Sequence, residues 1–113
     1  MALRFKLVFF SPRNSTSGIL DSLFKEFPHE LGKIGQYEQC AFITPGMGQF
    51  KPGPDANPVV GSSGKLEHIE EDRVELIIND KGEKVEVKKV IHALKIAHPY
   101  EEVAYDVYRL EDF

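Results

Sequence analysis

The sequence lacks several features that define whole classes of protein. Its 113 residues include one cysteine, Cys40, and no tryptophan. A single cysteine cannot form an internal disulfide, which excludes a disulfide-stapled fold and fits a reducing compartment. No apolar run approaches the roughly 20 residues that a membrane-spanning helix needs, and the apolar opening segment is too short for a signal peptide. We therefore expect a cytoplasmic protein, with the nucleus as the alternative, and no membrane contact.

An excess of positive charge is also missing. Lysine and arginine number 14 against 18 aspartate and glutamate residues, which gives a net charge of −4. Proteins that bind nucleic acid neutralise phosphates with clustered basic side chains, and here the basic residues are dispersed. We therefore expect no nucleic-acid partner.

The patterning that is present predicts one domain over residues 1–113, long enough to bury its own core. Alternating apolar residues predict strands over 3–10, 36–44, 66–78 and 103–110, the third broken or bulged near Asp72. Apolar residues at helical spacing predict one helix from Thr16 or Ser17 up to Pro28. Between residues 45 and 64, frequent glycine and proline predict an ordered loop or short hairpin instead of a helix.

A second helix is predicted to end at His98, because Pro99 disfavours helical geometry at the residue before it. Asp80 followed three residues later by Glu83 resembles a capping box at its start. Two helices with one apolar stripe each predict an α+β, ferredoxin-like sandwich, in which both helices cover one face of a mostly antiparallel sheet. The other face needs cover from the long loop or from another copy, so we expect a homo-oligomer, a trimer or dimer, with a protein partner as a further option.

The turn that follows the second helix holds the densest group of chemically able side chains, His98, Tyr100, Glu101 and Glu102. Imidazole and carboxylate both bind divalent metal ions, so His98 and Glu101 are candidate ligands. The structural alternative, which we favour, is that His98 caps carbonyls at the helix end and Tyr100 packs.

The long loop adds the candidate ligand-binding residues Gly46, Gly48, Phe50 and Asn57. Bare backbone N–H groups of glycine can cradle phosphates, but neither GxxxxGK[ST] nor GxGxxG occurs, and the glycines can equally serve tight turns. Cys40 is expected on a strand as a small buried residue. No nucleophile and base pair stands out, so we predict no catalytic residue.

Separated motifs, in order, resemble the inserted domain of Nif-three-like proteins. The resemblance extends from Leu3 to Leu110 and is carried by Gly35-Gln-Tyr-Glu-Gln-Cys40-Ala-Phe42, Gly46-Met-Gly48-Gln-Phe50-Lys-Pro52, Ala56-Asn57-Pro58, Gly61, Gly64, Glu67, Glu70, Arg73, Glu75, Ala97-His98-Pro99-Tyr100-Glu101-Glu102 and Tyr105-Asp106-Val107-Tyr108. One departure is Pro54-Asp55, which stands where the family often has a glycine.

This resemblance implies a fold similar to the PII signalling proteins and CutA, which form trimers. In the family the domain is inserted between halves of a larger domain that binds two metal ions. Those halves are missing here, so we expect a free-standing insert and no support for the family's label of type-two GTP cyclohydrolase. The implied function is a non-enzymatic binding or regulatory module. The alternatives are a CutA-like protein that binds a divalent metal ion and, last, a small hydrolase.

Overall fold

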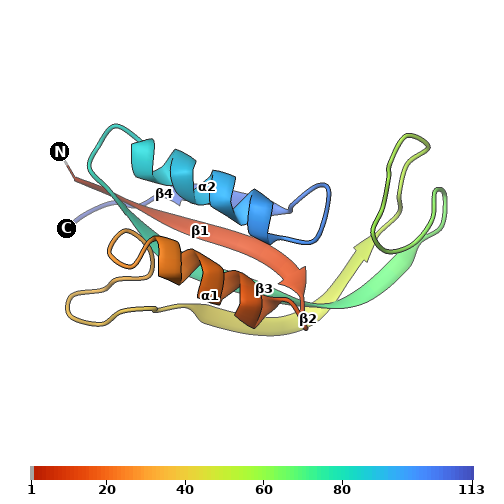
Figure 1. The fold of residues 1–113 in the computed structure, drawn as a ribbon, viewed down its shortest axis with the longest axis horizontal. Helices are drawn as coiled ribbons and strands as arrows, with labels where there is room; N and C mark the ends of the chain where they lie inside the picture. The colour runs from red at the N-terminus through yellow and green to blue at the C-terminus, as the bar shows by residue number, and fades with distance from the viewer. Residues whose placement is uncertain (1) are drawn as a thin grey trace.

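The computed structural model describes residues 2–113 and contains four strands and two helices. In chain order these are β1 (Leu3–Pro12), α1 (Thr16–Glu26), β2 (Phe42–Phe50), β3 (Glu67–Asp80), α2 (Val85–Ala97) and β4 (Tyr105–Arg109). The sheet order is β2-β3-β1-β4, and all three strand pairs are antiparallel. Both helices lie on one side of the sheet (Figure 1). The predicted α+β, ferredoxin-like fold is confirmed.

The core lies between the helices and one face of the sheet. Period-two alternation turns Leu7 and Phe9 of β1 toward the helices, where they meet Leu23 of α1 and Leu94 of α2. All four side chains are fully buried, and each such burial stabilises the fold by about 1.5–3 kcal/mol. The alternate side chains of β1 point away from the helices, and we call that side of the sheet the outer face.

The start of α1 is fixed by a buried polar network. The Thr16 hydroxyl donates to Asp72 Oδ2 at 2.6 Å and lies 2.6 Å from the Ser11 hydroxyl. The guanidinium Nε of Arg13 lies 3.7 Å from the other oxygen of Asp72. These contacts place the first helical residue at Thr16, as predicted. The predicted break near Asp72 is wrong, because Asp72 pairs in unbroken register with strands on both sides.

The second strand lies farther along the chain than the alternation indicated. The prediction of a strand over residues 36–44 is correct only for residues 42–44, since β2 runs from Phe42 to Phe50 and residues 36–41 belong to a turn and connector. Cys40 is therefore half-buried in a connector instead of lying on a strand, and its N–H donates to the Gly32 carbonyl. Pro45 is tolerated within β2 because β2 is an edge strand, where half of the N–H groups face no partner.

The start of α2 depends on one buried carboxylate. Asp80 accepts hydrogen bonds from the backbone N–H groups of Gly82, Lys84 and Val87, at 2.8, 2.9 and 3.2 Å. Burial alone would raise the pKa of Asp80, but these bonds outweigh it and the pKa is lowered. Asp80 thus satisfies the open N–H groups itself, instead of acting as half of a capping box with Glu83.

The molecule is elongated, with extents of 46, 25 and 24 Å. Figure 1 shows why: β2 and β3 continue past the helices as a two-stranded ribbon, and the loop of residues 51–66 lies at its far end. Within residues 2–113 no helix has the length and apolar character needed to cross a membrane.

Candidate ligand cavity on the outer face of the sheet

A cavity of about 390 Å³ lies where the ribbon meets the turn after α2. Its lining comes from β1, the end of β2, β3, the loop of residues 51–66 and the turn of residues 98–104. In the strand register Phe10 pairs with Arg73, two residues from Glu71, so the lining residues Phe10 and Glu71 share the outer face. We call this space, lined by Phe10, Phe50, Glu71, Tyr100 and the apolar residues of the loop, the outer-face cavity.

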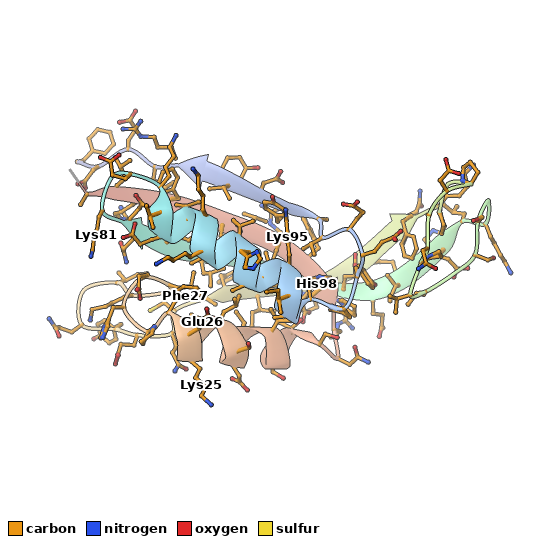
Figure 2. All side chains as sticks on the ribbon, turned by 45° about the horizontal axis from the view of Figure 1, so that its top comes forward. Lys25, Glu26, Phe27, Lys81, Lys95 and His98 are labelled. Carbon is orange, nitrogen blue, oxygen red and sulfur yellow. The ribbon has the colours of Figure 1, made fainter. Side chains whose placement is uncertain are left out.

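His98 lies at the end of α2 (Figure 2), two residues before the lining residue Tyr100, and is only 5% exposed. Its Nε2 lies 2.7 Å from the Phe10 carbonyl, and its Nδ1 lies 3.1 Å from the Tyr100 backbone nitrogen. A carbonyl only accepts and a backbone N–H only donates, so the ring is the neutral tautomer with its proton on Nε2. Burial lowers the pKa of His98, although the Phe10 carbonyl partly offsets that effect. His98 thus joins the end of β1 to the turn.

Tyr100 is placed by this contact so that its ring lines the cavity. Its centroid lies 5.1 Å from the His98 ring and 6.4 Å from the Phe50 ring. The Tyr100 hydroxyl is buried and has no hydrogen-bond partner among residues 2–113. Burial raises the pKa of Tyr100, and the nearby charge of Glu71 raises it further. The phenol therefore stays protonated, with its hydroxyl buried behind the ring that lines the cavity.

Glu71 lines the cavity and is not among the site residues that the sequence predicted. Its carboxylate lies over Gly48 of the neighbouring strand, where a Cβ would overlap the carboxylate atoms. Burial raises the pKa of Glu71. Within the described chain no hydrogen bond or ion pair reaches this carboxylate, whereas the adjacent Glu70 and Asp72 both contact Arg13. Period-two alternation could have separated Glu71 from its neighbours, but the role of Gly48 depends on strand pairing.

The long loop is tied to the turn by one backbone-to-side-chain bond. The Asn57 N–H donates to Glu101 Oε1 at 2.9 Å, and within the loop the Gly64 N–H donates to the Pro52 carbonyl at 2.8 Å. Asn57, a predicted ligand-binding residue, therefore contacts the turn through its backbone.

The predicted site residues thus fall into three groups. Phe50, Tyr100, Glu101 and Glu102 line the cavity together. His98, Gly48 and Asn57 support it without lining it, whereas Gly46 lies at the paired position opposite Glu71 and is not part of the lining.

The candidate metal ligands His98 and Glu101 are already engaged by backbone groups of the chain. Both ring nitrogens of His98 are engaged by the backbone, and the Glu101 carboxylate holds the Asn57 N–H. In the part of the chain that the structure describes, no three histidine, cysteine, aspartate or glutamate side chains gather as a metal site would require. These contacts favour the structural role of His98.

Comparisons with known proteins agree with the fold. No family model matches the sequence. A Halalkalibacterium halodurans protein named "GTP cyclohydrolase 1 type 2 homolog" is 41% identical over 106 residues, which are 94% of this chain and 27% of that protein. A Bacillus subtilis protein of the same name is 46% identical over 80 residues, 71% of this chain and 20% of that protein. The chain spans about a quarter of the length of the curated relatives that it matches.

Solved structures of a NIF3-related protein and of CutA have a similar fold. A Bacillus cereus protein related to NIF3 superposes with a TM-score of 0.76 at 37% identity, covering 99% of this chain and 27% of that one. CutA from Xylella fastidiosa superposes with a TM-score of 0.66 at 17% identity, covering 97% of this chain and 86% of that one. The second similarity concerns the fold alone.

Proposed function

Because this chain is a Nif-three-like module with a CutA-like fold, we propose that it is a non-enzymatic binding or regulatory module that takes up a small molecule in the outer-face cavity. The observation that carries the proposal is the convergence of Phe50, Tyr100 and Glu71 from three separate chain segments around one space of about 390 Å³. Small-molecule sites of about 300–1,000 Å³ with apolar walls and few polar groups are the usual form.

Binding is favoured over catalysis by the chemistry of the lining. The walls include Pro52, Pro58, Val59 and Val60, which suit burial of an apolar ligand. The lining has no serine, cysteine or histidine, and its ionisable side chains are Lys51, Tyr100 and three glutamates. The raised pKa of Tyr100 keeps its phenol protonated near neutral pH, which also suits recognition better than nucleophilic attack.

We test the cavity with a matched pair of variants in the loop. Ala56→Trp fills the cavity, because Ala56 lines it, whereas Ser63→Trp adds the same ring at an exposed position of the same loop. A fragment library is screened by amide chemical shifts. The proposal expects fragments that shift residues near Tyr100 in the parent protein and in Ser63→Trp, and no such shifts in Ala56→Trp. Fragments that shift other surfaces only, or none that bind, would contradict it.

Self-association is the second part of the proposal. The outer face exposes Phe42 by 68% and Tyr108 by 52%, on β2 and β4 at opposite edges of the sheet. A second copy of this chain would cover these aromatic side chains. Light scattering coupled to gel filtration should give a dimer or trimer that Tyr108→Glu dissociates. Ile96→Glu, on the exposed helix side, should leave the mass unchanged. A monomer across micromolar concentrations would refute this part.

The alternative of a CutA-like metal-binding protein has a direct test. Titration of zinc or copper into the parent protein and His98→Ala would show equal binding, or none, if His98 is structural as its contacts favour. The hydrolase alternative, with the cyclohydrolase named in the relatives, is tested by a nucleotide panel in a thermal-shift assay. A cytoplasmic location is retained as part of the proposal.

A further inference from the structure

We propose that the ligand of the outer-face cavity is a small organic cation, a primary ammonium or guanidinium group attached to an apolar or aromatic body, with Glu71 as its counter-ion. This inference rests on the proposed function and names the ligand class for the same cavity. It is carried by an acidic residue that the chain leaves without a partner in a largely apolar space.

In the acidic run of residues 70–72, the first and last carboxylates have a cationic partner among residues 2–113 and the middle one does not. Arg13 lies 3.4 Å from Glu70 and 3.7 Å from Asp72, so the two flanking carboxylates share one guanidinium on the helix side of the sheet. Glu71 alternates to the outer face, where no cation of residues 2–113 lies within ion-pair distance of it. The nearest arginine in sequence, Arg73, is paired with Glu75 at 3.6 Å. A partly buried carboxylate without a partner is costly, and an incoming cation removes that cost.

The ionisable side chains of the lining carry mostly negative charge, which suits a cationic ligand. Glu71, Glu101 and Glu102 face a single basic residue, Lys51. Glu101 already accepts the Asn57 N–H, so it holds the loop, while Glu71 remains free to bind. An anionic ligand would meet this surplus of carboxylates and be repelled.

The aromatic lining suits the same ligand. The rings of Phe50 and Tyr100 lie 6.4 Å apart at 53°, and Phe10 adds a third ring to the lining. Ring faces attract cations, and Phe10 already does so toward Arg73, whose guanidinium carbon lies 5.7 Å from the ring centroid. An ammonium has three donors, so it can bind the Glu71 carboxylate while its apolar body contacts these rings.

Gly48 makes this arrangement testable without changing any charge. A Cβ at Gly48 would overlap the end of the flexible Glu71 side chain and displace its carboxylate. Gly46 lies on the same strand, and a Cβ there meets nothing within 4 Å. Gly48→Ala should therefore weaken the site through Glu71, with Gly46→Ala as the matched control.

The experiment compares three probes of similar size by calorimetry and amide chemical shifts: 2-phenylethylammonium, the neutral 2-phenylethanol, and the anion phenylacetate. We expect the ammonium to bind about tenfold tighter than the alcohol, and Glu71→Gln to remove this preference. Gly48→Ala should lower ammonium affinity by about threefold or more, while Gly46→Ala and Glu70→Gln stay within about twofold of the parent. Glu70 is a suitable control because its carboxylate lies on the other sheet face.

The outcomes separate this inference from the function on which it rests. If the alcohol or phenylacetate binds in the cavity as tightly as the ammonium, or if Glu71→Gln leaves the preference intact, the cation inference is overturned and the cavity remains a binding site. If neither these probes nor the fragment library shifts any cavity residue, the proposed function fails as well. Circular dichroism checks that Glu71→Gln folds like the parent protein. If it does not fold, the ammonium affinity of Gly48→Ala tests the role of Glu71 independently.

Discussion

Replacing His98 with alanine tests the claim that this residue is a structural clamp. The substitution removes two hydrogen bonds and leaves the Phe10 carbonyl and the Tyr100 N–H without their partners. An orphaned buried polar group costs about 1–3 kcal/mol, so the two together predict a loss of about 2–6 kcal/mol of unfolding free energy. That is a large share of the roughly 5–15 kcal/mol expected for a domain of this kind.

Urea unfolding followed by circular dichroism measures this loss as a lower midpoint. The control is His92→Ala, since His92 lies on the same helix and is exposed, and such surface changes stay within about 0.5 kcal/mol. A loss below about 1 kcal/mol for His98→Ala, or equal losses in both variants, would refute the clamp.

The pH dependence of the unfolding free energy provides a second test of the structural role of His98. Burial lowers the pKa of His98 in the folded protein, so the unfolded chain binds the proton first as the pH falls. The contribution of neutral His98 is therefore complete above about pH 6.5 and is lost as the pH falls from there toward the lowered folded pKa. Unfolding measured at about pH 7.5 and pH 5 should show a smaller fall for His98→Ala than for the parent. Equal falls would show that His98 titrates alike in both states.

Three further substitutions follow from the contacts described. Asp80→Ala should cost about 1–2 kcal/mol and shift the chemical shifts of the first turn of α2, because its carboxylate holds three backbone N–H groups there; an unchanged urea midpoint would contradict that role. Tyr100→Phe should leave thermal stability equal or raise it by up to about 1 kcal/mol, because the lost hydroxyl has no partner within residues 2–113; a clear loss would reveal a bond. Thr16→Val should cost about 1–3 kcal/mol in urea unfolding by leaving the buried Asp72 carboxylate without its hydroxyl donor, and a neutral result would remove that network from the stability of α1.

The elements that the sequence predicted well are those with a regular period and one buried face. β1 alternates, both helices carry one apolar stripe, and each lies close to its predicted residues. Pro99 marked the end of α2 correctly, because the restriction that proline imposes is local and needs no knowledge of the fold.

The second strand was misplaced because its own residues carry little signal. Pro45, Gly46 and Gly48 are typical of loops, and only pairing with β3 makes them a strand. The alternation in residues 36–41 was real but had no partner strand, so these residues instead form a turn closed by the Ile34–Tyr37 bridge and a connector with Gln39 at positive φ. Strand pairing is a long-range property that overrides local preference.

The candidate site was predicted in part for the same reason. The sequence named Phe50, Tyr100 and Glu101 on chemical grounds, and these residues do meet. Glu71 was missed because its environment depends on a glycine from another strand, 23 positions away in the chain, and on the arginine that pairs with its neighbours. His98 was named as a candidate ligand before its two backbone partners could be known.

The attachment of the long loop has a consequence for the rates at which the molecule exchanges ligand and solvent. The bond from Asn57 to Glu101 is exposed, and breaking such a bond costs about 1 kcal/mol, far less than opening the buried layer beneath α1 and α2. The loop of residues 51–66 can therefore open and let a ligand enter the cavity many times before the core unfolds once. Amide hydrogen exchange should therefore be fast at the Asn57 amide and slow at the amides of the central strands.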